Sequence, residues 1–261
     1  MPEFRHIRVD VPEKGILLIT IDRPEALNAI HDAAHRELER VFDRYTADLE
    51  LRVAIITGAG ERSFCVGSDL KAKSQKSYRA DENPRSGFAG ITSRFDLCKP
   101  VIAAVNGYAF GGGLEIVLAC DLVVAVSDAM FCFPEPLVGQ AALSGGIQRL
   151  VRHIPYKRAM QMLLTCERVG AQAAYDLGFI NQVVDRPALI GSALAMARSI
   201  IRGAPLAIEC TKAVAMRAFS DSVERSIVDH HQAALTMLLS SDAHEGPLAF
   251  TEKRAPCWTG S

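Results

Sequence analysis

The chain has 261 residues, of which 49% are hydrophobic and 23% are charged, and its net charge is −1. This composition predicts one large packed core, with or without a small appendage, and it excludes a disordered chain. The near-neutral charge provides no general attraction to nucleic acid or to an anionic membrane.

The cysteines and the N-terminus indicate the cellular location of the protein. The seven cysteines are scattered, their number is odd, and no two of them form a CxxC pair, which is typical of reduced thiols in a cytosolic protein. Residues 1–6 lack the apolar stretch of a signal peptide, and no run of about 18 apolar residues predicts a membrane span. We therefore expect a cytoplasmic protein.

The first part of the chain predicts strands and one helix. Residues 4–11 alternate apolar and polar side chains and residues 15–21 form a denser apolar run, so together they predict an antiparallel strand pair. Apolar side chains at helical spacing predict a helix over 33–49, and a buried strand is expected over 53–57. The polar stretch 71–87 predicts a surface loop or a poorly ordered helix, with a role as a lid left open.

The rest of the chain changes from strands to helices. A helix to about Cys98 is expected first, and the strands expected after it are 101–105, 121–126, 131–133 and 179–184. The helices expected from about residue 187 onward are 188–201, 205–218, 222–239 and 242–253. This order predicts a mixed α/β core over 1–198 and a helical region over 199–261 that packs on the core or on a neighbouring subunit.

Three consecutive glycines, Gly111 to Gly113, run from an apolar strand into the expected start of a helix. Their spacing differs from the Rossmann GxGxxG, and Leu114 follows where a P-loop would have lysine. Uncapped backbone N–H groups point outward at such a helix start. A flexible turn or close helix packing would need the same glycines, so the neighbouring residues decide between these interpretations.

Two glutamates lie near this glycine run. Glu115 falls in the first helical turn, where the helix dipole favours an ionised carboxylate, either as a simple helix stabiliser or as a base. Glu135 stands between Pro134 and Pro136 among apolar residues, so it is either an ordinary loop carboxylate or an acid kept protonated by desolvation. N–H donors beside one ionised and one protonated carboxyl predict chemistry on a carbonyl compound.

A second loop, residues 64–70, follows the strand expected at 53–57. Gly67 permits tight backbone geometry there, so the Ser68 N–H is a candidate second donor to an oxyanion, although an Asx-type turn closed by Asp69 explains the same residues. Two other motifs are set aside. His31 and His35 resemble HExxH without a third ligand, so we expect no metal site, and no serine stands in a GxSxG elbow.

Four segments together resemble the enoyl-CoA hydratase/isomerase (crotonase) superfamily. These segments are Arg23-Pro-Glu-Ala-Leu-Asn28, Cys65-Val-Gly-Ser-Asp-Leu70, Val101 to Glu115 and Phe133-Pro-Glu-Pro-Leu-Val-Gly139. The resemblance covers essentially the whole chain. It implies an α/β fold, a spiral of ββα units, whose C-terminal helices build trimers or hexamers made of two trimers.

The resemblance also implies roles for individual residues. The N–H groups of Ser68 and Gly112 would hold the thioester oxygen, while Glu115 and Glu135 would hold the water and move its protons. We expect substrate contacts from Ala26, Leu27, Gly67, Asp69, Leu70, Gly111, Phe133, Leu137, Phe250 and Lys253. Of these, Ala26 and Leu27 would line the CoA groove, and Phe250 and Lys253 would contact the CoA of a neighbouring subunit.

The resemblance therefore implies an enoyl-CoA hydratase, a hydro-lyase that adds water reversibly to a 2-trans-enoyl-CoA and whose CoA enters with the substrate, without a further cofactor. Retention of both glutamates favours hydration or its reverse over double-bond isomerisation. A narrower similarity to carnitinyl-CoA dehydratases lies in 87–92, 106–113 and 245–250 with Trp258. Carnitinyl-CoA dehydration, double-bond isomerisation and a non-catalytic scaffold or RNA-binding role remain the alternatives. Ala142 replaces a proline common in the family, so the sequence leaves the acyl preference open.

Overall fold

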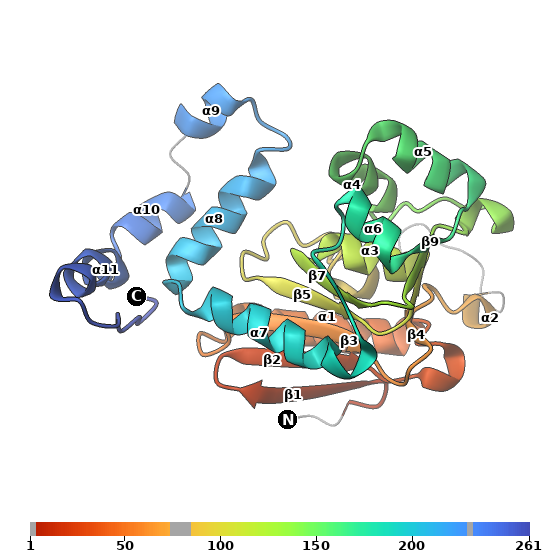
Figure 1. Cartoon of the computed structure of the whole chain (residues 1–261), viewed down its shortest axis with the longest axis horizontal. Helices are drawn as coiled ribbons and strands as arrows, with labels where there is room; N and C mark the ends of the chain where they lie inside the picture. The colour runs from red at the N-terminus through yellow and green to blue at the C-terminus, as the bar shows by residue number, and fades with distance from the viewer. Residues whose placement is uncertain (1–3, 74–84, 229–231) are drawn as a thin grey trace.

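Two β-sheets form the centre of the molecule in the computed structural model, which describes residues 4–73, 85–228 and 232–261 (Figure 1). In spatial order, the six-stranded sheet contains β1 (Ile7–Glu13), β2 (Ile16–Ile21), β3 (Val53–Gly58), β5 (Val101–Val105), β7 (Leu122–Val126) and β10 (Gln182–Val184). The four-stranded sheet contains β4 (Ser63–Cys65), β6 (Tyr108–Phe110), β8 (Met130–Cys132) and β9 (Val169–Gly170). The predicted antiparallel pair is confirmed as β1 and β2, and in the large sheet β2, β3, β5, β7 and β10 run parallel to one another.

A strand–strand–helix repeat connects the two sheets. The first strands of the repeats, β3, β5 and β7, lie in the large sheet, and the second strands, β4, β6 and β8, lie in the small one. The helices that follow are α2 (Leu70–Lys73), α3 (Gly112–Ala119) and α4 (Gly146–His153). The predicted α/β fold of ββα units is therefore confirmed. Strands β3 and β5 are buried along their whole length, as expected for parallel strands covered on both faces.

Helices cover the sheets. α7 (Leu189–Ile201) packs on β3, β5 and β7, and α1 (Asp32–Ala47) buries Leu38, Phe42 and Tyr45. His31 Nδ1 accepts the Ala34 N–H at 3.1 Å, so this histidine caps α1. The described residues contain no group of three or more side chains that could hold a metal ion.

One expected helix is wrong. The segment after Gly87 forms a short 3₁₀ turn, Phe88–Gly90, followed by further turns up to Cys98. Gly87, Ala89 and Gly90 have φ of 73°, 53° and 71°, which an α-helix does not accept. A Cβ atom on Gly90 would lie 2.6 Å from the Glu39 Cα, so the turn presses against α1. Residues 74–84 of the predicted loop or lid lie outside the described residues.

Three helices were not expected from the sequence, namely α4, α5 (Tyr156–Thr165) and α6 (Ala171–Leu177). α5 and α6 lie between α4 and β10, and α5 packs on α4. The helices expected at 205–218 and 242–253 are α8 (Pro205–Arg217) and α11 (Ser241–Glu252). The single helix expected at 222–239 appears as α9 (Val223–Val228) and α10 (Gln232–Leu238), and residues 229–231 between them lie outside the described residues. α7 continues past residue 198, where the two regions were divided, and that division stays a prediction.

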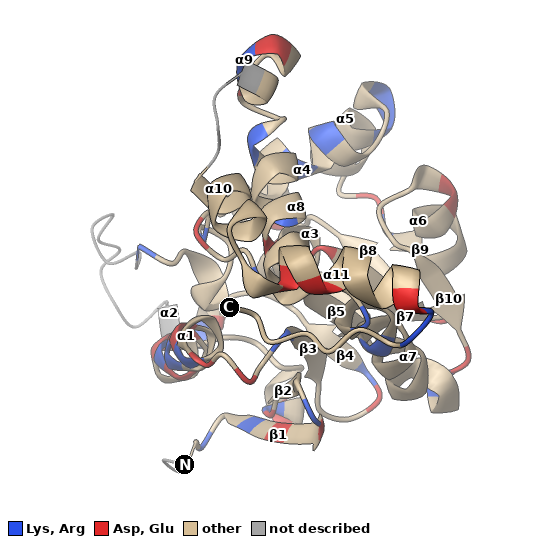
Figure 2. Cartoon of the chain, turned by 90° about the vertical axis from the view of Figure 1, so that its left-hand side faces the viewer, with Lys and Arg blue, Asp and Glu red and all other residues tan. Residues whose placement is uncertain are grey.

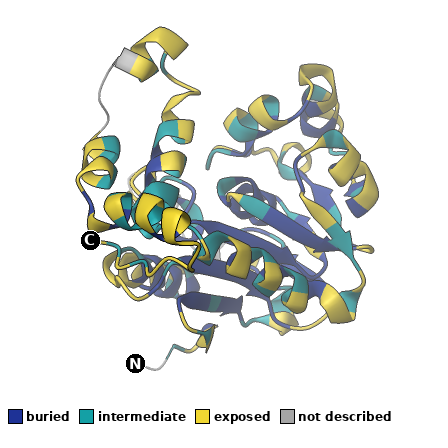
Figure 3. Ribbon diagram, turned by 60° about the vertical axis from the view of Figure 1, so that its left-hand side comes forward, coloured by how far each residue is buried: buried dark blue, intermediate teal, exposed yellow. Residues whose placement is uncertain are grey.

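The helices α8 to α11 extend away from the two sheets (Figure 1). Figure 3 shows that they are mainly exposed or half-buried, whereas the strands are buried. Large apolar side chains stand on their surface: Phe219, Val223, Ile227, Leu238, Leu239 and Phe250. An exposed apolar area of this kind usually marks a surface that another protein covers.

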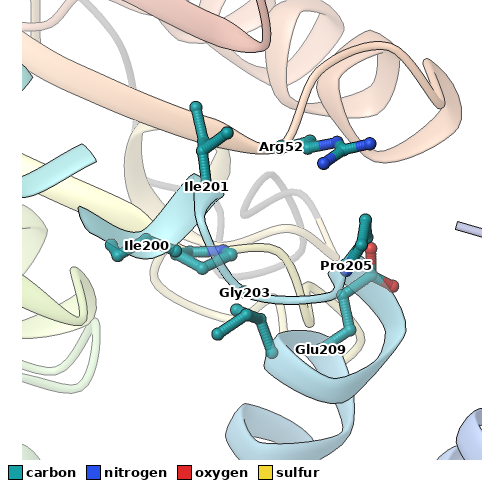
Figure 4. Close-up of a pocket in the computed structure, with 8 residues that line it drawn as sticks. Arg52, Ile200, Ile201, Gly203, Pro205 and Glu209 are labelled. Carbon is teal, nitrogen blue, oxygen red and sulfur yellow. The ribbon is translucent and has the colours of Figure 1, made fainter. Parts of the chain in front are cut away.

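Polar contacts hold α8 to the core where the chain turns from α7. A cavity of about 10 Å³ lies at this turn, lined by Arg52, Ile200, Ile201, Gly203, Pro205 and Glu209 among others (Figure 4). Nearby, Lys212 Nζ contacts Asp121 Oδ2 at 2.7 Å and donates to the Lys99 carbonyl at 2.9 Å. Further along α8, a larger cavity of about 940 Å³ separates this helix from α4 and the segment 91–97.

Charges of both signs are mixed over the face seen in Figure 2, in agreement with the net charge of −1. No helix within the described ranges combines the length and the apolar character that a membrane crossing requires.

Candidate active site

The glycine run at the start of α3 is required by close packing on three sides. A Cβ atom on Gly113 would lie 1.9 Å from the Cys65 carbonyl oxygen, and one on Gly112 would lie 2.6 Å from the Phe88 ring. Gly111 has a φ of 54°, a backbone conformation that glycine adopts without strain. Side chains are thus excluded here, and the Gly112 N–H at the first position of α3 has no acceptor in the described part of the chain.

The loop after β4 brings a second backbone donor beside the first. Gly67 has a φ of 90°, and a Cβ atom on it would lie 2.9 Å from the Gly112 nitrogen. Ser68 forms an isolated parallel bridge with Ile30, in which the Ile30 N–H donates to Gly67 O and the Asp69 N–H donates to Ile30 O. The Ser68 N–H takes no part in this bridge. Two neighbouring N–H groups are thus left to hold an oxygen atom.

Glu115 is buried in the first turn of α3, with 4% of its surface exposed. Its Oε1 accepts the Gly146 N–H at 3.0 Å, which places the carboxylate at the N-terminus of α4. Burial raises the pKa of Glu115, while hydrogen bonds from Gly146 and Ser144 and the charge of Arg149 oppose this rise. The carboxylate therefore has built-in partners for its ionised form, as a base needs.

Glu135 follows β8 and begins a 3₁₀ turn, Glu135–Val138. Its carboxyl lies against the glycine run, since a Cβ atom on Gly111 would be 3.0 Å from Glu135 Oε1. Burial and the negative charge of Glu115 raise the pKa of Glu135 to about 7. Its Oε2 is buried and finds no hydrogen-bond partner among the described residues. A buried carboxyl without a partner is suited to hold a proton and to give it to a bound molecule.

The structure brings together the four residues expected to be catalytic, because Ser68, Gly112, Glu115 and Glu135 all adjoin the glycine run. Phe133 belongs to the same cluster: a Cβ atom on Gly146 would lie 2.8 Å from the Phe133 ring and 2.9 Å from Glu115 Cγ. The carboxylates, the donors and one apolar wall thus form a single site.

The other expected substrate contacts are more scattered. Leu27 adopts a φ of 52° in the loop that precedes the Ile30 bridge, and Ala26 is half-buried beside it. Leu70 and Leu137 are exposed. Phe250 and Lys253 lie at the end of α11, and Figure 1 shows α11 on the far left of the view, apart from α3, which carries the glycine run.

Gly146 is a functional residue that the sequence analysis missed. No role was expected for Gly146, whose backbone N–H donates to Glu115 Oε1. Two glycines at the start of an amphipathic helix, Gly145 at its N-cap and Gly146 at its first position, are the signal that could have revealed an open helix start here. That signal does not show which side chain accepts the hydrogen bond, because the acceptor, Glu115, lies 31 residues away.

Comparison with known proteins identifies close relatives. A model of the family described as enoyl-CoA hydratase/isomerase matches residues 12–261. A carnitinyl-CoA dehydratase of Proteus mirabilis is 44% identical over 250 residues, which cover 94% of this chain and 95% of that protein. A carnitinyl-CoA dehydratase of Citrobacter koseri is 46% identical over the same shares of both chains.

Solved structures agree with these relatives. The enoyl-CoA hydratase from Mycobacterium tuberculosis H37Rv superposes with a TM-score of 0.91 at 38% identity, covering 98% of this chain and 99% of that one. The carnitinyl-CoA hydratase from Mycobacterium avium has a TM-score of 0.76 at 41% identity, with the same coverage.

Proposed function

Since the chain belongs to the enoyl-CoA hydratase/isomerase family and is an enzyme of the hydro-lyase type, we propose a hydration reaction for it. In this reaction, the enzyme adds water reversibly across the C2–C3 double bond of a 2-enoyl-CoA thioester. The single observation that supports this reaction best is that the carboxyl groups of Glu115 and Glu135 lie beside two backbone N–H groups, those of Ser68 and Gly112. Burial raises the pKa of both carboxyl groups, but only Glu115 has hydrogen-bond partners that oppose this rise from elsewhere in the chain. Water addition needs a base, an acid and a holder for the enolate oxygen, and the site contains a candidate for each.

Each group has one step in the proposed mechanism. The thioester oxygen accepts hydrogen bonds from the Ser68 and Gly112 N–H groups, which stabilise the enolate formed when water attacks C3. Glu115 takes a proton from that water, and Glu135 gives its proton to C2, so that the 3-hydroxyacyl thioester leaves with no net change of charge. Dehydration runs the same steps backward. Losing one such backbone donor typically costs about 3 kcal/mol of transition-state stabilisation.

We further propose that the physiological substrate is a carnitine-like thioester, so that the enzyme interconverts carnitinyl-CoA and crotonobetainyl-CoA. This choice is supported by curated relatives named carnitinyl-CoA dehydratase at 44% to 46% identity over most of the chain. An unsubstituted enoyl-CoA such as crotonyl-CoA is the second candidate, because structural neighbours at 38% and 39% identity are named enoyl-CoA hydratase.

Steady-state rates on crotonyl-CoA and crotonobetainyl-CoA would test both statements. Glu115→Gln and Glu135→Gln should each lower the rate about 10² to 10⁴-fold, because each removes one proton-transfer group. Glu209→Gln is the matched control, since burial also raises the pKa of this glutamate but it lies on α8, outside the site. Near wild-type rates in both site variants would refute the assignment. Conversion of a 3-enoyl-CoA to the 2-enoyl isomer before any hydration would instead indicate an isomerase.

The surroundings of the site complete the proposal. A homotrimer or a hexamer of two trimers is supported by the exposed apolar side chains of α8 to α11 and by the distance of Phe250 and Lys253 from their own site. All seven cysteines are free, which supports a reducing, cytoplasmic location. Because the chain supplies both donors and both proton-transfer groups, we propose that the reaction uses no cofactor beyond the CoA of the substrate.

A further inference from the structure

We propose that Arg23 is the positioning residue of the oxyanion hole: its guanidinium group joins the two loops whose backbone bridge directs the Ser68 N–H toward the thioester oxygen. This inference rests on the proposed function, because it takes Ser68 N–H as one of the two donors.

The direction of the Ser68 N–H is decided by its bridge with Ile30. In this parallel bridge Ile30 donates to Gly67 O at 2.8 Å and Asp69 donates to Ile30 O at 2.9 Å. The two residues that flank Ser68 therefore make both hydrogen bonds. Alternate residues of an extended segment direct their N–H groups to opposite sides, so the Ser68 N–H points away from Ile30 and has no acceptor among the described residues.

Arg23 holds both sides of this bridge at once. Its Nη1 donates to the Ala29 carbonyl at 2.5 Å, directly before Ile30. Its Nη1 and Nη2 contact Asp69 Oδ2 at 3.2 Å and 3.1 Å, directly after Ser68. A planar guanidinium can make these contacts in one fixed geometry, whereas the ammonium group of a lysine could not reproduce the fork.

The arginine is itself firmly placed. Its N–H donates to Asn28 Oδ1 at 3.0 Å and its carbonyl accepts the Asn28 N–H at 2.9 Å. Asn28 is fully buried, and its Nδ2 donates to the carbonyls of Ala59 and Ser63, on either side of the β3–β4 connection. The loop that carries Arg23 is thereby anchored to the same part of the core from which the Ser68 loop emerges.

The ion pair between Arg23 and Asp69 is largely shielded from solvent. The side chains of Arg23 and Asp69 are only 13% and 17% exposed, so solvent screens them less than a surface pair. Without Arg23, the Asp69 carboxylate would lose its guanidinium partner next to the donor that faces a developing enolate, so its negative charge would be less well offset there. Removing Arg23 should therefore both loosen the donor and oppose the transition state.

The test combines turnover with a direct measurement of the bound carbonyl. Wild type, Arg23→Gln and Arg23→Lys are compared for kcat and KM on crotonyl-CoA and crotonobetainyl-CoA. In parallel, isotope-edited infrared spectra record the thioester C=O stretch of bound butyryl-CoA, which has no C2–C3 double bond and is therefore not hydrated. Arg8→Gln is the matched control, because Arg8 pairs with Asp22 at 2.9 Å on the exposed surface of the same region.

We expect Arg23→Gln to lower kcat about 10 to 100-fold with a smaller change in KM, since donors to an oxyanion act mainly in the transition state. The red shift of the bound carbonyl stretch should shrink in the same variant, Arg23→Lys should recover only part of both effects, and Arg8→Gln should match wild type. A merely structural role for Arg23 would lower thermal stability and leave the carbonyl shift of the folded protein unchanged.

The outcomes separate the two proposals. If wild type shows no carbonyl red shift with butyryl-CoA, the oxyanion hole and the proposed function fail. If wild type shows the shift and Arg23→Gln retains both that shift and wild-type kcat, the inference about Arg23 is refuted while the function stands. Should Arg23→Gln not fold, Arg23→Lys and Asp69→Asn decide: an unchanged carbonyl shift and kcat in both would overturn the inference.

Discussion

The partly buried carboxyl of Glu135 makes a sharp prediction about stability. Replacing it with glutamine keeps the shape of the side chain and removes the charge that the site disfavours. We expect Glu135→Gln to be more stable than wild type near pH 8 and equally stable near pH 4.5, although the variant should be nearly inactive. Such a trade between stability and activity is common at catalytic residues, because they are kept in unfavourable surroundings.

The magnitude follows from the pKa of Glu135, which burial raises from 4.5 to about 7. At 1.36 kcal/mol per pH unit this difference is about 3.4 kcal/mol, and solvent screening of the partly exposed carboxyl reduces it to about 2 to 3 kcal/mol. Between pH 4.5 and 7 the unfolded chain loses the proton that the folded chain keeps. The stability of wild type therefore falls as the pH rises through this window and loses nothing further from Glu135 above it.

Urea denaturation at pH 4.5 and pH 8 measures this difference. Wild type and variant are compared at one protein concentration, because subunit association adds to the apparent stability. Glu50→Gln is the control, since this glutamate is 81% exposed and its replacement should change stability by less than about 0.5 kcal/mol at either pH. A stability difference between Glu135→Gln and wild type that is the same at both pH values would refute the argument.

Two further predictions concern the proton and the glycine run. If Glu135 gives the C2 proton, kcat/KM for hydration should fall as the pH rises through about 7, and a flat profile to about pH 8.5 would contradict this role. Gly113→Ala should cost about 3 kcal/mol or more in urea denaturation, because its Cβ would lie 1.9 Å from a backbone oxygen. Gly191→Ala in α7 meets no atom within 4 Å and should stabilise the protein by about 0.5 to 1 kcal/mol; equal effects of the two substitutions would refute the steric reasoning.

Local patterns predicted much of the fold. The buried strands β3 and β5 and the helices α1, α7, α8 and α11 lie within a few residues of their predicted bounds, because uninterrupted apolar runs and helical spacing are properties of short segments. The segment after Gly87 was wrongly expected to be a helix. Its positive φ angles are imposed by contact with α1, and that contact is invisible in the segment itself.

The residues of the site could also be recognised only in part from the sequence. The uncapped glycines before α3, the glutamate in its first turn and the desolvated glutamate between two prolines could all be recognised from residue type and neighbours in sequence. Whether each glutamate is ionised or protonated depends on partners elsewhere in the chain. Glu115 is paired by Gly146, 31 residues away, and the raised pKa of Glu135 depends on its burial and on the charge of Glu115.

The sequence by itself thus determined the family, the α/β repeat and the set of groups available for water addition. The tertiary structure alone decided how these groups are held: Gly67 packed beside Gly112, Ser68 bridged to Ile30, and Arg23 joined to both Ala29 and Asp69. Residue types and short spacings record the chemical character of a side chain and its local backbone preference. Distances between loops far apart in the chain arise only when the core packs, and those distances turn a set of candidate groups into a site.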